Sequence, residues 1–155
     1  MYFTASGTRF LRLFFVIIES MFNNKNYGMK ILQILTRVFV APEDFTKTIE
    51  FYEGLTNTKC GLKVDYREMN LQLAQTGPFL IIAGAKEALE PFIGTAVTVL
   101  VDSIAGYYNY FREKGVEILQ EPKAVPTGFN MRVLHPGGLV AEYVEHTSAK
   151  EAFTN

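Results

Sequence analysis

The most informative segment of this chain is a turn followed by a strand at residues 135–145, which read His135-Pro136-Gly137-Gly138-Leu139-Val140-Ala141-Glu142-Tyr143-Val144-Glu145. Proline fixes φ in the turn, and the glycines provide the positive φ that a tight hairpin needs. Side chains alternate along a strand, so Glu142 shares one face with Val140 and Val144. A carboxylate on such an apolar face requires a cation, a metal or a hydrogen-bond donor as its partner. The identity of that partner separates the possible functions.

The residues that lead up to this hairpin have the pattern of a complete βαβββ unit. Asp102-Ser103 begins the predicted helix, and Gly115 ends it. Three side chains of that helix follow i, i+4, i+7 spacing and are expected in the core, whereas two tyrosines are expected to be partly exposed. The core set is Ile104, Tyr108 and Phe111, and the exposed pair is Tyr107 and Tyr110. Strands are predicted near residues 96–101, 116–119, 129–134 and 139–145.

The same order of elements occurs earlier in the chain. A strand over residues 31–40 precedes a helix capped by Asp44, and Phe45, Ile49 and Tyr52 repeat the i, i+4, i+7 spacing. Because an internal repeat of this size determines the architecture, we predict an α+β fold. It consists of two tandem βαβββ modules that form a curved mixed sheet around a cleft. The modules span about residues 31–84 and 95–145, with strands near 60–67, 70–75 and 79–84 in the first and a polar connector at 85–94.

Composition indicates one globular domain without a nucleic-acid interface. The chain has 155 residues, enough for a substantial core, and its net charge of −1 lacks the basic excess of a nucleic-acid binder. The single cysteine, Cys60, excludes an internal disulfide and a zinc site of several thiolates, so a cytoplasmic protein is expected. The domain is predicted over residues 29–147, followed by a tail at 148–155.

Residues 1–28 are predicted to be an extension outside the fold, with Met29 as the true start of the protein. The alternative is a short membrane-seeking or partner-binding helix built on the apolar run at residues 13–18. That run is much shorter than the ~20 apolar residues that cross a bilayer, so no membrane span is expected.

Three segments in this order and spacing resemble the vicinal oxygen chelate superfamily, which includes glyoxalases, bleomycin-binding proteins, fosfomycin-resistance enzymes and extradiol dioxygenases. The segments are residues 40–52, Val99-Leu100-Val101-Asp102-Ser103 and residues 135–142. The resemblance covers essentially everything after residue 30. It implies a ligand cleft framed by both modules and, by analogy with the bleomycin-binding members, a homodimer.

The resemblance also implies where a metal would bind. The family's metal enzymes take ligands from the first strand of each module, the last strand of the first module and the final strand. Only Glu142 matches here, because the other three positions fall at Leu35, on residues 79–83 and at Ala96, none of which offers a donor side chain. His146 lies four strand residues from Glu142, about 13 Å away, which is too far to share one ion. We therefore expect no metal and assign no catalytic residue.

If the first strand has the phase that the resemblance implies, Arg37 lies on its cleft-facing side, together with Leu35. A guanidinium and the Glu142 carboxylate would then stand where the family holds a cation, either as a structural ion pair or as polar anchors for a ligand. The predicted ligand-binding residues are Arg37, Glu142, Gln33, Leu35, Tyr66, Phe79, Ala96, Phe129 and Met131.

The predicted function is metal-independent binding of a small organic molecule in the cleft. One alternative is a metal-dependent lyase, isomerase or dioxygenase, with a divalent ion held by Glu142 and a non-standard ligand such as Gln33. The other alternative is a structural or regulatory dimeric module whose cleft is filled by its own side chains.

Overall fold

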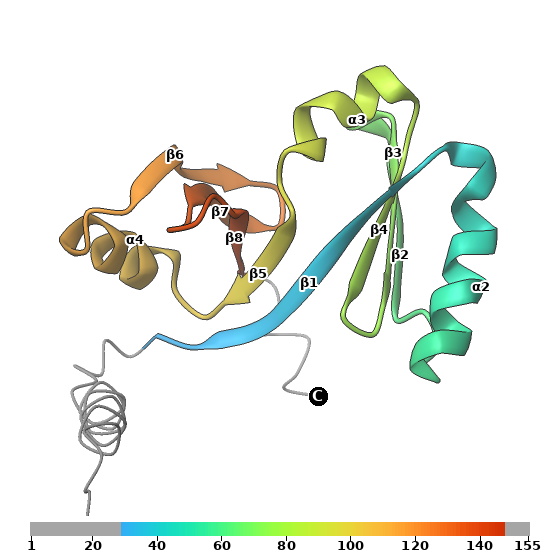
Figure 1. Cartoon of the computed structure of the whole chain (residues 1–155), viewed down its shortest axis with the longest axis horizontal. Coiled ribbons are helices and arrows are strands. Elements are labelled where there is room, and N and C mark those ends of the chain that lie inside the picture. The colour runs from blue at the N-terminus through green and yellow to red at the C-terminus, as the bar shows by residue number, and fades with distance from the viewer. Residues whose placement is uncertain (1–28, 148–155) are drawn as a thin grey trace, which may run out of the picture.

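The structure, a computed structural model, describes residues 29–147 and has two halves that meet along the first strand (Figure 1). The predicted extension at residues 1–28 and the tail at 148–155 lie outside the described residues. The first half contains β1 (Ile31–Val40), α2 (Phe45–Thr56), β2 (Leu62–Tyr66), β3 (Leu71–Thr76), β4 (Phe79–Ala83) and α3 (Lys86–Ile93). The second half contains β5 (Val97–Val101), α4 (Ile104–Glu113), β6 (Glu117–Val125), β7 (Gly128–Leu134) and β8 (Val140–His146).

All eight strands belong to one open mixed sheet in the order β2-β3-β4-β1-β5-β8-β7-β6. The antiparallel pair β1–β5 forms its centre. On either side of that pair, the first strand of a module lies parallel to the last one, β1 to β4 and β5 to β8. The order of strands outward from the centre is therefore the same in both modules. This arrangement confirms the predicted α+β fold of two βαβββ units.

The helices α2 and α4 cover the same face of the sheet, one for each module. Phe45 and Ile49 of α2 pack on Ile81 of β4, and Phe111 of α4 packs on Met131 of β7. Leu80 of β4 and Arg132 of β7 point to the opposite, concave face, because strand side chains alternate. The two helices thereby leave the concave face available for a site.

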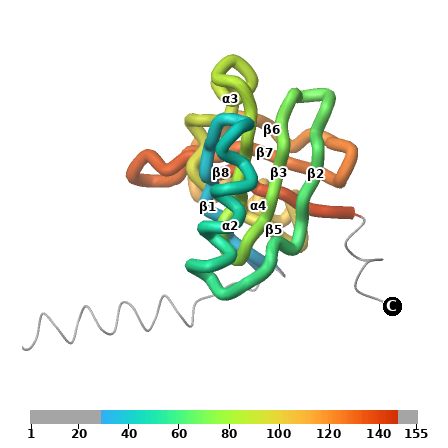
Figure 2. The backbone as a smooth tube through the Cα atoms, turned by 90° about the vertical axis from the view of Figure 1, so that its right-hand side faces the viewer, coloured from blue at the N-terminus to red at the C-terminus, as the bar shows by residue number. Residues whose placement is uncertain are grey.

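Residues 85–94 are not a connector, because they contain the helix α3. Its charged residues and Pro91 gave the segment the composition of a loop. Its apolar side chains instead form one narrow stripe, in which Leu89 is buried against Leu71 and Ile82 of the concave face and Phe92 packs beside them. Figures 1 and 2 show α3 at one end of the first module, apart from α2.

The buried tyrosine of α4 is Tyr107, where Tyr108 was predicted. The ring of Tyr107 lies 5.4 Å from that of Tyr143 in β8. Tyr108 is only partly buried, and its hydroxyl accepts a hydrogen bond from Arg112 at 3.1 Å. Residues at i+3 and i+4 both lie near the core face of a helix, so the spacing alone could not choose between the two tyrosines. Among residues 29–147, no helix is long and apolar enough to span a membrane.

Candidate functional site

A cavity of about 550 Å³ lies on the concave face of the sheet, opposite α2 and α4. Strands of both modules line it, together with Pro91 and Phe92 of α3. A volume of this size falls within the range of about 300–1,000 Å³ that is usual for small-molecule pockets. The cavity is therefore the candidate functional site of the described part of the chain.

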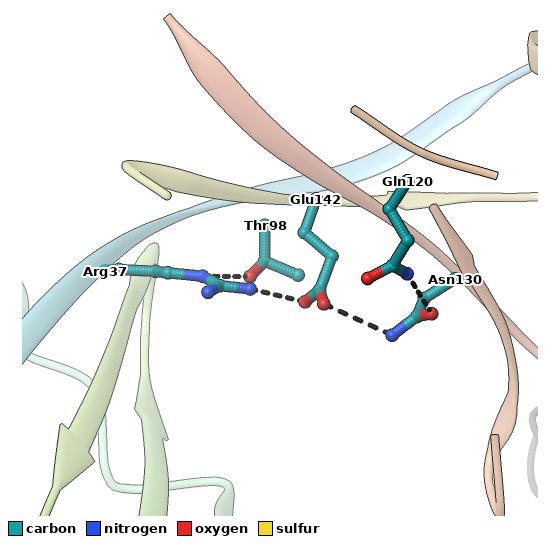
Figure 3. Close-up of polar contacts among 5 residues, drawn as sticks. All are labelled: Arg37, Thr98, Gln120, Asn130 and Glu142. Atoms are coloured by element: carbon teal, nitrogen blue, oxygen red, sulfur yellow. Dashed lines mark hydrogen bonds and ion pairs between the residues drawn. The ribbon is translucent and has the colours of Figure 1, made fainter. Parts of the chain in front are cut away.

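A row of five polar side chains crosses the floor of this cavity, each from a different strand (Figure 3). Arg37 of β1 donates from Nε to Oγ1 of Thr98 in β5 at 2.9 Å, and its Nη2 forms an ion pair with Oε2 of Glu142 in β8. Asn130 of β7 donates from Nδ2 to Oε1 of Glu142 at 3.2 Å. Gln120 of β6 donates from Nε2 to Oδ1 of Asn130 at 3.1 Å. The row joins the first strand of module one to the outermost strand of module two.

The ion pair at the centre of this row is largely buried. The side chain of Arg37 is 4% exposed and that of Glu142 is 20% exposed. Burial lowers the pKa of Arg37, and the charge of Arg132 acts in the same direction, while Glu142 opposes both. A guanidinium nevertheless stays protonated in proteins, so the cavity floor holds a fixed positive charge that is matched by one carboxylate.

Four of the predicted site residues line the cavity. They are Arg37 and Glu142, which form the expected pair, together with Leu35 and Tyr66. A fifth, Gln33, is held beside the cavity by two hydrogen bonds. Its Nε2 donates to the carbonyl of Gly77 at 3.3 Å, and its Oε1 accepts from Nε2 of Gln75 at 3.0 Å. The structure thus brings together the polar pair and its apolar neighbour, whereas their role in binding stays a prediction.

The predicted positions of Phe129 and Met131 are corrected by the phase of β7. Met131 is fully buried beneath α4, on the face opposite the cavity. Phe129 shares that phase and lies near the strand end, where it is 41% exposed and pairs with Glu145. Because side chains alternate along a strand, it is Asn130 and Arg132 that face the cavity.

Phe79 and Ala96 also lie outside the cavity lining. The ring of Phe79 packs on that of Tyr52 in α2, with centroids 4.2 Å apart, because its strand places Leu80 on the concave side. Ala96 precedes β5 and is exposed. Thr98, two residues further along β5, supplies the side chain that faces the cavity.

Sequence reasoning missed several polar residues of the second module that line the cavity. They are Thr98, Gln120, Lys123, Asn130 and Arg132. The hairpin that contains the Gly-Gly turn offered a signal for two of them, Asn130 and Arg132, which lie on the same face of β7. Arg132 lies directly opposite Glu142 across that hairpin, and directly opposed residues share a face of the sheet. No comparable local signal identified Gln120, because β6 extends to Val125, well beyond the strand predicted near residues 116–119.

Solved structures share this architecture. A hypothetical protein from Methanosarcina mazei is 43% identical to this chain, with 77% of this chain and 95% of that one covered and a TM-score of 0.64. Methylmalonyl-CoA epimerase from Mycobacterium tuberculosis, an enzyme of the vicinal oxygen chelate superfamily, is 16% identical, with 79% and 93% covered and a TM-score of 0.57. A hypothetical protein from Bacillus halodurans is 18% identical, with 77% and 95% covered and a TM-score of 0.51.

The chain has the fold of the vicinal oxygen chelate superfamily. The predicted resemblance is therefore confirmed at the level of the fold. No family model matches the chain, and no curated protein matches it. The likeness to the epimerase concerns the fold alone.

The side chains at the centre of this vicinal oxygen chelate fold do not fit a metal ion. Both carboxylate oxygens of Glu142 accept hydrogen bonds, one from Arg37 and one from Asn130. A divalent ion beside Glu142 would also face the buried guanidinium of Arg37, a charge of the same sign. Within residues 29–147, no group of three or more His, Cys, Asp or Glu side chains is arranged to hold a metal. The donor set is thus a poor match to the ligands of the superfamily's metal enzymes.

Proposed function

We propose that this protein binds a small organic molecule in the concave cavity without a metal ion. The observation that carries the proposal is the buried pair of Arg37 and Glu142. It stands where the resemblance places the metal of the superfamily's metalloenzymes, and it supplies a cationic and an anionic group of fixed position. The cavity lies between the two modules, as the resemblance implies. The charged groups at its centre are two side chains of the protein, where the metalloenzymes hold a metal ion.

The surroundings of the pair support a binding role. Thr98 holds Nε of Arg37, and Asn130 holds the second oxygen of Glu142, so both charged groups are fixed before any ligand arrives. A preorganised polar group loses little side-chain entropy on binding, which increases affinity. Apolar side chains on the remaining walls, such as Leu73 and Leu80, provide area for the hydrophobic part of a ligand.

A thermal-shift screen of small organic compounds, with and without a chelator, tests this proposal. A ligand at about 100 times its Kd should stabilise the protein by about 2.7 kcal/mol, and the chelator should not change that effect. The substitution Leu73→Trp, which fills the cavity, should abolish the stabilisation. The matched control is Leu55→Trp, because Leu55 lies on α2 and is 62% exposed. It should leave the response unchanged.

Two results would overturn the proposal. The first is a stoichiometric divalent ion in purified protein that is lost in Glu142→Ala, which would support a metalloenzyme. The second is the absence of any stabilising compound, which would favour a structural or regulatory module.

We also propose a homodimer, which the resemblance to the bleomycin-binding members supports. Light scattering during size-exclusion chromatography of the full chain should give twice the 17.5 kDa mass of one copy. A mass of one copy at all concentrations would contradict the dimer and leave the binding proposal intact.

A further inference from the structure

The two modules give the cavity walls of different chemistry. The wall from the first module is mainly aliphatic, with Leu62, Val64, Leu71, Leu73, Leu80 and Ile82. The wall from the second module is mainly polar, with Gln120, Lys123, Asn130, Arg132, Glu142 and His146. A molecule that lies between these walls therefore meets an apolar surface on one side and hydrogen-bonding groups on the other.

The residues that line the cavity carry more positive than negative charge. Three are cationic, Arg37, Lys123 and Arg132, and Glu142 is the single carboxylate. The ion pair neutralises Arg37 with Glu142, which leaves two cationic side chains, both from the second module. An anionic group is the natural complement of this part of the wall, because a cationic ligand would be repelled by it.

Arg132 is the cation best placed to receive that group. Its Nε is buried and has no hydrogen-bond partner among the described residues. It lies directly opposite Glu142 in the β7–β8 ladder, yet both oxygens of that carboxylate are occupied by Arg37 and Asn130. A buried donor that is left unpaired costs free energy, and a ligand acceptor that reaches Arg132 recovers it.

We propose that the cavity binds an organic carboxylate with an apolar body, an inference that rests on the proposed binding function. The carboxylate accepts hydrogen bonds from the guanidinium of Arg132, whose planar fork of donors matches two carboxylate oxygens. The apolar body lies against the aliphatic wall, where Leu73 and Leu80 are among its contacts. Arg37 and Glu142 remain paired with each other and form the floor between the two parts of the ligand.

Three probes of equal chain length test this assignment: octanoate, 1-octanol and octylamine, each titrated into the full-length protein by calorimetry. Octanoate should bind with a Kd lower than that of either other probe by at least about tenfold, the ratio expected for one hydrogen-bonded charge. Arg132→Gln should raise the Kd for octanoate by a similar factor and leave the Kd for 1-octanol unchanged. Leu73→Asn should weaken both octanoate and 1-octanol.

Two further variants serve as controls. Arg67→Gln also removes one positive charge, but the Arg67 side chain is 88% exposed and pairs with Asp65 away from the cavity. It should bind octanoate as the wild type does. Arg132→Lys keeps the charge and loses the planar fork, so its affinity for octanoate should fall between those of wild type and Arg132→Gln. It also separates loss of binding from loss of folding if Arg132→Gln proves unstable.

The outcomes separate this inference from the proposal on which it rests. Equal affinity for octanoate and 1-octanol, tighter binding of octylamine, or an unchanged octanoate Kd in Arg132→Gln would overturn the carboxylate assignment. Each of the first two still leaves a cavity that binds small molecules. Failure of all three probes and of the compound screen would overturn both proposals.

Discussion

The two modules pack their helices in the same way but present different side chains to the cavity. Beneath α2 lies Ile81, and beneath α4 lies Met131, both fully buried. On the concave face, Leu73 of the first module contrasts with Asn130 and Arg132 of the second. The helix-covered face must fill space closely in either module, whereas the concave face is free to carry other chemistry. The repeated fold therefore conserves a scaffold and allows each wall of the site to differ.

The largest effect is expected where the two modules meet. Glu142→Ala leaves the guanidinium of Arg37 buried without its carboxylate, and loss of one partner of a buried pair typically costs about 3–5 kcal/mol. Glu145 is the matched control, because it lies on the other face of the same strand and accepts the backbone N–H of Ile104 at 2.8 Å. Glu145→Ala should cost about 0.5–2 kcal/mol, as for loss of a helix cap. Urea unfolding gives both values.

A double variant shows whether the loss comes from the unpaired charge. Arg37→Met combined with Glu142→Leu removes both charges, and such replacements are often neutral or stabilising. It should therefore be more stable than Glu142→Ala alone. If Glu142→Ala costs no more than Glu145→Ala, the pair at the cavity floor is not the buried link between modules that its contacts indicate.

The two helix-covered cores should respond alike. Ile81→Ala under α2 and Met131→Ala under α4 each remove a fully buried side chain, so each should lower the free energy of unfolding by about 2–5 kcal/mol. Leu55→Ala on the exposed side of α2 should change it by less than about 0.5 kcal/mol. If one core variant is as stable as the wild type, the two cores do not contribute equally to the free energy of unfolding.

Local patterns were sufficient to predict most of the fold. The i, i+4, i+7 spacing that begins at Phe45 and again at Ile104 located α2 and α4. The repeat predicted the order of helices and strands along the chain. The pair of Arg37 and Glu142 was also predicted, from the strand phase that the family resemblance implies for Arg37 and from the apolar neighbours of Glu142 in the sequence. Apart from the position of Arg37, these features depend on residues that are close together in the sequence, so the sequence of one chain is enough to predict them.

The remainder of the site depends on contacts between distant strands. The five-strand polar row requires the pairing of β8 with β5 and β7, which is a tertiary feature. The phase of β7 was predicted wrongly because Phe129 and Met131 are apolar. Apolar side chains are compatible with a ligand pocket and with a core, so their type did not show which face of β7 they occupy. The helix α3 was missed because Pro91 and three charged residues hide its short apolar stripe. Pairing Arg132 with Glu142 across the Gly-Gly turn would have corrected the first of these errors.

The starts of α2 and α4 provide a smaller test of the same comparison. The side chain of Ser103 accepts the N–H of Gly106 at 3.1 Å, whereas Asp44 at the start of α2 makes no capping hydrogen bond. Ser103→Ala should therefore cost about 1 kcal/mol. Asp44→Ala loses an exposed ion pair with Lys47, which should cost about 0.5 kcal/mol or less. Thermal unfolding that ranks Asp44→Ala as the more damaging change would contradict the cap assignment.

The smallest expected effect is a dependence of stability on pH that arises from His135 in the second module. His135 shares a hydrogen bond of 3.1 Å with the Tyr143 hydroxyl, and burial lowers the pKa of His135. The folded chain therefore favours the neutral imidazole, and below the ordinary pKa of about 6.5 the unfolded chain binds the additional proton. The free energy of unfolding should be constant just above that pH and fall as the pH decreases through it. Urea unfolding at about pH 7.5 and about pH 5 should show a smaller loss in His135→Gln than in the wild type. Equal losses in both proteins would show that His135 is not the group responsible.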